Sequence, residues 1–114
     1  MLFAHEMTHI WQWQNRKTTG YHPLKGAAEH TPGHDPYLFD LNTQATLLDF
    51  AYEQQGAIVE EFVCCRALDP QAPRTQRLRV MLETAFGTDA MQSTLPRPEA
   101  ILPWDGATTK NICR

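Results

Sequence analysis

Residues 2–14 read LFAHEMTHIWQWQ, and this stretch decides how the rest of the chain is interpreted. It contains no proline or glycine, and its bulky residues can cover one broad side of a helix. Nothing breaks the pattern before about Lys17, so we predict a helix over residues 2–17. His5 and His9 are four residues apart and therefore lie on the same face of this helix, about 5–6 Å apart at Cβ.

The pattern His5-Glu6-Met7-Thr8-His9 is typical of a zinc site, because both imidazoles can reach one ion. Glu6 lies about 100° around the helix from His5, so its carboxylate can approach a metal-bound water without occupying a coordination position. Zinc lowers the pKa of such a water to about 7, and Glu6 can then act as general base in the hydrolysis of an amide or ester. The alternative is a chance arrangement of structural histidines.

A catalytic zinc site needs three protein ligands and one open position. A second proline-free helix is predicted over residues 47–68, with Gly56 as its weak point, and it offers three glutamates. Of these, Glu53 and Glu60 share a helix face, whereas Glu61 does not. Glu53 is our choice as third ligand, although spacing alone does not rank it above Glu60.

The stretches LFAHEMTHIWQWQ (2–14) and DFAYEQQGAIVEEF (49–62) resemble two blocks of a zinc metallopeptidase family found in Rhs- and Vgr-related proteins of bacterial type VI secretion. In that family the HExxH helix continues into Val/Ile-Trp-Gln, and the glutamate of an EQQA-like block corresponds to Glu53. The resemblance covers about the first half of the chain. It implies a zincin-like, gluzincin-type fold, Zn²⁺ held by His5, His9 and Glu53, and peptide-bond hydrolysis by a secreted effector.

Departures from related families refine this expectation. Metzincins extend the motif with a glycine and a third histidine, but Gln12 and Asn15 occupy those positions, which excludes that class. Thermolysin-type gluzincins orient a histidine with an aspartate one turn after the ligand glutamate, where this chain has Ala57. We therefore expect Asp49 or Glu60 to take that role.

The start of the chain differs from that of zincins, which normally place a substrate-binding strand before the HExxH helix. Met1 lies only four residues before His5, so we expect a domain truncated at its N-terminus, with a protein partner as one source of the missing segment. Truncation favours a rival interpretation, a non-catalytic zinc-binding module. A second rival is a helical partner-binding protein without metal.

A long loop is predicted over residues 18–36, with candidate donors in His22, His30 and His34. Tyr37 follows this loop and is our candidate hydrogen-bond donor to a developing oxyanion, the alternative being a half-buried packing residue. Residues 37–41 alternate large apolar side chains and permit one short strand. The fold is therefore expected to be mainly α, with at most a short strand or hairpin.

The second half of the chain carries fewer signals. Proline near the start and Gly87 as C-cap predict a third helix over residues 73–86. We expect a metallopeptidase core over residues 1–90 and an irregular, proline-rich tail over 91–114. Arg74, Arg77 and Arg79 are interpreted as a solvated helix face.

Composition bounds the remaining possibilities. The 114 residues are 42% hydrophobic and carry a formal charge of −3, which argues against nucleic acid or an anionic membrane as the main partner. No apolar run is long enough to span a bilayer, and no signal peptide precedes the motif. The odd number of cysteines, Cys64, Cys65 and Cys113, predicts reduced thiols in the cytoplasm of the producing bacterium, with secretion as an effector left open.

Overall fold

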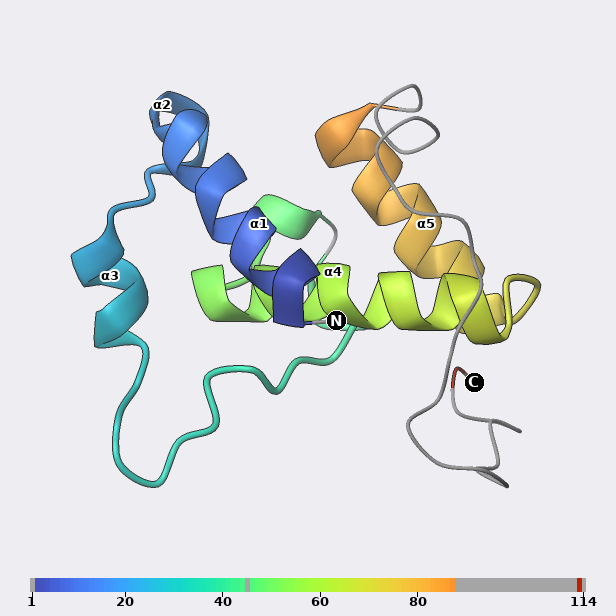
Figure 1. The fold of residues 1–114 in the computed structure, drawn as a ribbon. Helices are drawn as coiled ribbons and strands as arrows, with labels where there is room; N and C mark the ends of the chain where they lie inside the picture. Colours follow the sequence, from blue (N-terminus) through green and yellow to red (C-terminus); the bar gives the residue numbers. More distant parts are fainter. Residues whose placement is uncertain (1, 45, 88–112, 114) are drawn as a thin grey trace. The chain divides into compact units, whose positions relative to one another are not determined.

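A computed structural model describes residues 2–44, 46–87 and 113 (Figure 1). These residues form helices joined by turns, without a strand, so the prediction of a mainly helical fold is confirmed. The elements are α1 (Leu2–Gln14), α2 (Arg16–Thr19), α3 (Pro23–Ala28), the 3₁₀ helix η1 (Leu47–Asp49), α4 (Tyr52–Leu68) and α5 (Pro73–Phe86).

The first helix ends three residues earlier than predicted. The Asn15 side chain donates a hydrogen bond to the Trp11 carbonyl at 2.9 Å, and its backbone leaves the helical region at φ −106°, ψ 28°. Side-chain bonds of this kind compete with the helical ladder. The chain resumes as the short helix α2, which ends at Gly20 in the left-handed conformation.

Helix α4, which carries Glu53, starts at Tyr52 rather than at the predicted residue 47. Thr46 and Asp49 form a local turn, because the Asp49 carboxylate accepts both the Thr46 backbone N–H and its hydroxyl. Phe50 is then extended, so the helix can begin only after it. Glu29 accepts the backbone N–H groups of Tyr52 and Glu53 at 2.9 and 2.8 Å, which satisfies two donors at the helix start.

The strand predicted over residues 37–41 is wrong. The Asp35 carboxylate accepts the backbone N–H of Tyr37, and Asp40 does the same for Asn42, both at 2.9 Å. Such aspartate turns bend the backbone every few residues and prevent strand pairing. The predicted loop over residues 18–36 also contains the helix α3, which starts at Pro23 with the His22 ring accepting the Leu24 N–H.

The chain consists of two compact units, Met1–Glu60 and Glu61–Arg114. In the first unit, α1 lies across the beginning of α4, and the two helices are joined by direct hydrogen bonds between their side chains (Figure 1). Four large apolar side chains are buried there: Leu41, Leu47, Phe50 and Ile58. This unit contains both halves of the predicted metal site.

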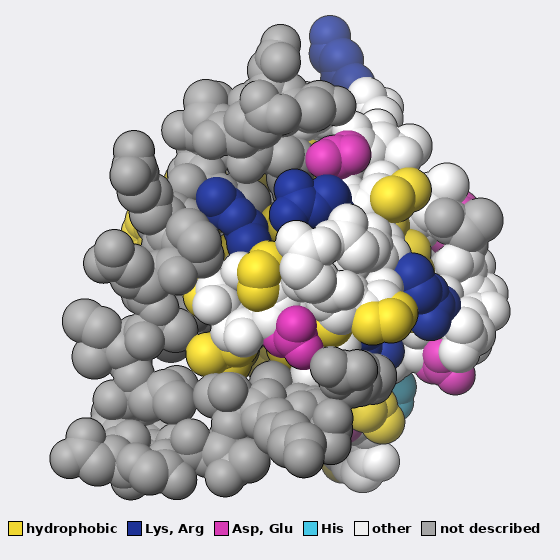
Figure 2. All heavy atoms as spheres, turned by 90° about the vertical axis from the view of Figure 1, so that its right-hand side faces the viewer, with side chains coloured by type: hydrophobic (Ala, Val, Ile, Leu, Met, Phe, Trp, Pro, Cys, Tyr) yellow, Lys and Arg dark blue, Asp and Glu magenta, His cyan; other side chains and the backbone are white. Residues whose placement is uncertain are grey.

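The second unit combines the end of α4 with α5, whose predicted bounds over residues 73–86 are confirmed. Phe62, Leu78 and Leu82 are buried, and Arg74 binds the Glu61 carboxylate with two nitrogens at 2.8 and 3.2 Å. In Figure 2 the described Lys and Arg side chains lie among acidic, apolar and other side chains. The predicted tail over 91–114 lies outside the described residues except for Cys113.

Two of the cysteines are bonded to each other. Cys65 on α4 and Cys113 form a disulfide across 48 residues of sequence, and both are buried beside Ala72. The prediction of three reduced thiols is therefore wrong for this pair, because the fold brings together two cysteines that sequence spacing does not connect. Cys64 carries a thiol. No described helix combines the length and hydropathy that crossing a membrane requires.

Candidate metal centre

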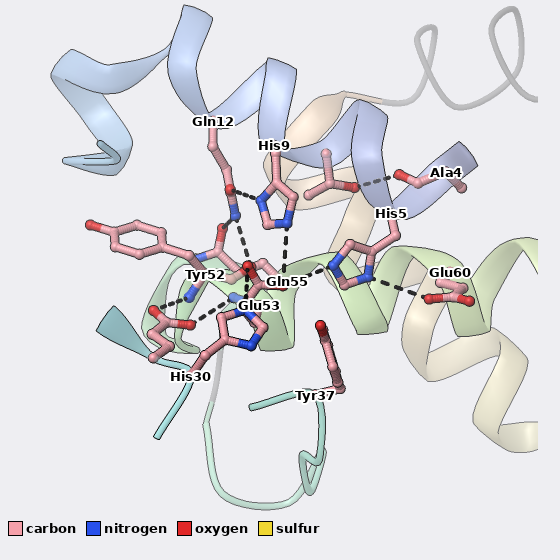
Figure 3. A network of polar contacts seen from close by, with 12 residues as sticks. Ala4, His5, His9, Gln12, His30, Tyr37, Tyr52, Glu53, Gln55 and Glu60 are labelled. Atoms are coloured by element: carbon pink, nitrogen blue, oxygen red, sulfur yellow. Dashed lines mark hydrogen bonds and ion pairs between the residues drawn. The ribbon is translucent and has the colours of Figure 1, made fainter. Parts of the chain in front are cut away.

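Two histidines from α1 and one glutamate from α4 converge on a single point (Figure 3). His5 and Glu53 are 4% and 7% exposed, and His9 is partly buried. Glu53 Oε2 lies 3.0 Å from His5 Nε2 and 3.3 Å from His9 Nε2. One ligand atom from each residue lies within 4.8 Å of the other two.

These distances fit a small divalent cation. Zinc–nitrogen and zinc–oxygen bonds of about 2.0–2.2 Å imply ligand atoms roughly 3.3–3.5 Å apart around a tetrahedron. The two measured contacts of 3.0 and 3.3 Å are close to that edge length. The residue types also fit, since two imidazoles and one carboxylate are a common ligand set of catalytic zinc.

Each of the three side chains has a partner at its other polar atom. His5 Nδ1 lies 3.3 Å from Glu60 Oε2, His9 Nδ1 lies 2.8 Å from Gln12 Oε1, and Glu53 Oε1 lies 3.4 Å from His30 Nε2. Partners at these positions orient metal ligands and set the tautomer of each histidine. The converging atoms are therefore the ones left for an ion.

Glycine makes the close approach of the two helices possible. Gly56 is buried on α4 directly beneath the His5 ring, and a Cβ atom there would lie only 2.7–2.9 Å from three ring atoms. Real Cβ atoms essentially never come that close. Gly56 lowers the helix propensity of α4, but its missing side chain leaves the space that the His5 ring occupies.

Electrostatics favour positive charge at the centre. Burial alone would raise the pKa of Glu53, but the hydrogen bond from His5, the charge of His9 and the hydrogen bond from His30 outweigh it and hold that pKa below its usual value. Glu53 is therefore an anion at neutral pH and available as a ligand. In a neutral His9 with its proton on Nδ1, the Nε2 lone pair faces this carboxylate, so a cation between them would be bound by both atoms.

A pocket of about 470 Å³ opens over the centre. Glu6 lies on its wall and is exposed, so its carboxylate is accessible to a reactant bound there. Tyr37 also lines the pocket, with its ring 5.4 Å from that of His5 in an edge contact. Burial, followed by the charges of Glu53 and Glu6, raises the pKa of Tyr37, so the phenol keeps its proton and can donate it in a hydrogen bond.

The other predicted candidates lie elsewhere or have other roles. Glu60 Oε2 lies 3.3 Å from His5 Nδ1, the position expected of an orienting residue, whereas Asp49 does not contact His5. Asp49 closes the turn before α4, and His22 caps α3. His34 is exposed and is not among the residues that line the pocket.

The sequence did not identify which residues contact the three converging side chains: it left His30 level with two other histidines and gave Gln12 and Gln55 no role. The His30 side chain is 45% exposed, and the sequence alone does not distinguish it from the other two loop histidines. The neighbouring Glu29 accepts the Glu53 N–H at the start of α4, and this contact brings His30 close to Glu53. Gln12 and Gln55 are 0% and 1% exposed and bridge α1 to α4 with a 2.9 Å hydrogen bond. A local signal existed for Gln12, which lies three residues after His9 on one helix face.

Comparisons of the chain with protein-family models, with curated proteins and with solved structures find no match. The functional assignment therefore depends on the geometry of His5, His9 and Glu53 and on the residues around them.

Proposed function

We propose that this protein is a zinc-dependent peptidase with a zincin-like domain. His5, His9 and Glu53 are the metal ligands, Glu6 is the general base and Tyr37 the oxyanion donor. The observation that carries the proposal is the convergence of both Nε2 atoms on Glu53 Oε2 at 3.0 and 3.3 Å, on the floor of an open pocket. A general base beside the metal site supports hydrolysis of an amide or ester, and the resemblance to metallopeptidases favours a peptide bond.

The main competing explanation of these contacts is a metal-free ion pair. Protonated histidines would also satisfy Glu53, and His5 would then donate from both nitrogens, to Glu53 and to Glu60. Contacts of this length and partners at the outer atoms are compatible with both explanations. The metal is favoured by the ligand set of two imidazoles and one carboxylate and by the pocket, which leaves one side of the centre accessible.

The chain's own residues divide the chemistry between them. When bound, zinc supplies Lewis-acid polarisation of the scissile carbonyl and lowers the pKa of a coordinated water. Glu6 removes a proton from the attacking water and passes it to the leaving amine. Tyr37, with its phenol protonated, donates a hydrogen bond to the oxyanion that develops on the carbonyl oxygen.

The substrate class and the setting also belong to this proposal. The resemblance to metallopeptidases of Rhs- and Vgr-related proteins supports a peptide or protein substrate and an effector associated with type VI secretion. The protein would be made in the cytoplasm of the producing bacterium. The disulfide between Cys65 and Cys113 favours action in a more oxidising compartment after export.

A second candidate function is a helical partner-binding module. It is favoured by one outward face of α1, on which Phe3, Met7, Ile10 and Trp13 are exposed. Apolar side chains gathered in this way are typical of a protein contact. This module would fold and bind its partner equally well with and without a chelator, whereas the peptidase would lose its metal and its activity.

The decisive assay is cleavage of casein and of a mixed peptide library by the zinc-loaded protein, with Glu6→Gln as the matched variant. Glu6 is exposed on the pocket wall and is not a ligand, so Glu6→Gln should keep zinc. Loss of general-base catalysis should lower kcat by about 10²- to 10⁴-fold. Equal cleavage by both proteins would show that the activity is a contaminant or that Glu6 is not the base. Zinc binding without any cleavage would favour a non-catalytic zinc module.

A further inference from the structure

Two buried glutamines connect the candidate ligand His9 to the backbone at the start of α4 (Figure 3). Gln12 Oε1 lies 2.8 Å from His9 Nδ1, and Gln12 Nε2 donates to Gln55 Oε1 at 2.9 Å and to the Tyr52 carbonyl at 3.1 Å. Gln55 Nε2 in turn donates to the Phe50 carbonyl at 2.9 Å. Every member is within hydrogen-bonding distance of the next.

The direction of this chain of hydrogen bonds is fixed at its far end. A backbone carbonyl can only accept, so the Phe50 carbonyl requires Gln55 to present its amide nitrogen there and its oxygen to Gln12. Gln12 must then present its amide nitrogen to Gln55. The Tyr52 carbonyl can also only accept a hydrogen bond, so it requires the same orientation of the Gln12 amide. The oxygen of Gln12 is thereby left facing His9 Nδ1.

We infer that Gln12 and Gln55 are positioning residues that hold His9 as the Nδ1–H tautomer and so reserve its Nε2 lone pair for the metal. The inference rests on the proposed function for its metal, but the proton on His9 Nδ1 follows from the hydrogen bond to Gln12 alone. An oxygen acceptor at 2.8 Å requires a proton on Nδ1. A neutral imidazole carries only one proton, so Nε2 is then the ligating atom.

The same bridge sets the spacing of the two ligand-bearing helices. Gln12 is one turn beyond His9 on α1, and Gln55 is two residues after Glu53 on α4. Their buried amides form a direct hydrogen bond between α1 and α4 in which no candidate ligand takes part. Buried polar groups are costly without partners, so this bridge tolerates only one register of the helices.

Nuclear magnetic resonance of ¹⁵N-labelled imidazoles tests the inference directly, because it reads the tautomer of His9 in metal-free protein. We expect neutral His9 to be the Nδ1–H form in the wild type and to shift towards the Nε2–H form in Gln12→Leu. Gln12→Glu keeps an oxygen acceptor for Nδ1 but loses the donor to Gln55 and to the Tyr52 carbonyl, so it should keep the Nδ1 proton at a cost in stability. Gln14→Leu, an exposed glutamine on the same helix, is the matched control.

Zinc affinity gives the second readout. Loss of an orienting partner typically weakens metal binding by about 10- to 100-fold, which is the change expected for Gln12→Leu and for Gln55→Leu. If the single variants unfold, the double variant replaces both amides by apolar side chains and keeps the comparison possible. A wild-type His9 in the Nε2–H form, or a Gln12→Leu tautomer identical to wild type, would overturn the inference. Failure of wild-type protein to bind zinc would instead overturn the proposed function and leave the tautomer result intact.

Discussion

Gly56→Ala is a substitution that should damage the metal site while leaving the fold intact. A Cβ atom at this position of α4 would lie 2.7 Å from Cε1, 2.8 Å from Nε2 and 2.9 Å from Nδ1 of His5. Ordinary van der Waals contact begins at 3.4 Å, so the ring must move by about 0.7 Å. The His5 ring is the far end of a side chain and can move without disrupting the backbone of either helix.

The two consequences of this substitution have opposite signs. Alanine stabilises a helix interior by about 1 kcal/mol relative to glycine. The new contact with the His5 ring destabilises the folded protein by roughly 1–3 kcal/mol, so the first effect offsets part of the second. The net change in the free energy of unfolding of metal-free protein should therefore be small. A ligand displaced by about 0.7 Å exceeds the tolerance of about 0.5 Å within which such sites must be held. We expect zinc affinity to fall by about 10- to 100-fold, or about 1.4–2.7 kcal/mol.

Competition with a chromophoric chelator measures the zinc Kd, and thermal unfolding of metal-free protein measures stability. Ala57→Gly, the next residue of α4, is the reciprocal control: it should cost about 1 kcal/mol of stability through helix propensity and leave zinc affinity unchanged. A Gly56→Ala protein with the wild-type zinc Kd would refute the reasoning, because His5 would then not need the space above Gly56.

Three further predictions follow from the structure. Tyr37→Phe should retain zinc and lower kcat by about 10²- to 10³-fold, measured by steady-state peptide hydrolysis, and an unchanged kcat would remove Tyr37 from the mechanism. Glu29→Ala removes the acceptor for two N–H groups at the start of α4 and should lower the free energy of unfolding by about 0.5–2 kcal/mol in urea titrations, with Glu29→Gln as the milder variant. Cys113→Ser should cost about 2–4 kcal/mol of stability under non-reducing conditions, and no difference from wild type would mean that the disulfide does not form in solution.

The parts of the site that are local in sequence could be predicted. His5, Glu6 and His9 lie on one helical turn, and helix periodicity alone brings the two imidazoles to one face. The helix that carries Glu53 was expected from its proline-free, helically spaced sequence, although spacing could not choose between Glu53 and Glu60. The structure distinguishes their positions, with Glu53 Oε2 near both Nε2 atoms and Glu60 behind His5.

The parts that depend on tertiary contacts could not be predicted. Glu29 caps a helix that begins 23 residues later, so no local pattern connects them. The same contact places His30 next to Glu53, and this position distinguishes His30 from the other loop histidines, His22 and His34. Side-chain bonds at Asp35 and Asp40 override the apolar alternation that suggested a strand.

The pairing of Cys65 with Cys113 is likewise a product of the fold, since the two residues are 48 positions apart. An odd cysteine count argued for free thiols, but it does not forbid one disulfide with a remaining thiol. In the folded chain the two cysteines are buried in one cluster with Ala72.

The most direct test of the account is the zinc content of purified protein by elemental analysis, compared between wild type, His9→Ala and Glu53→Ala. The account predicts one zinc per wild-type chain and its loss in both variants, because each removes an atom that converges on the same point. Wild-type protein without zinc after incubation with the ion would contradict the central claim, and one zinc retained in Glu53→Ala would show that the third ligand is another residue.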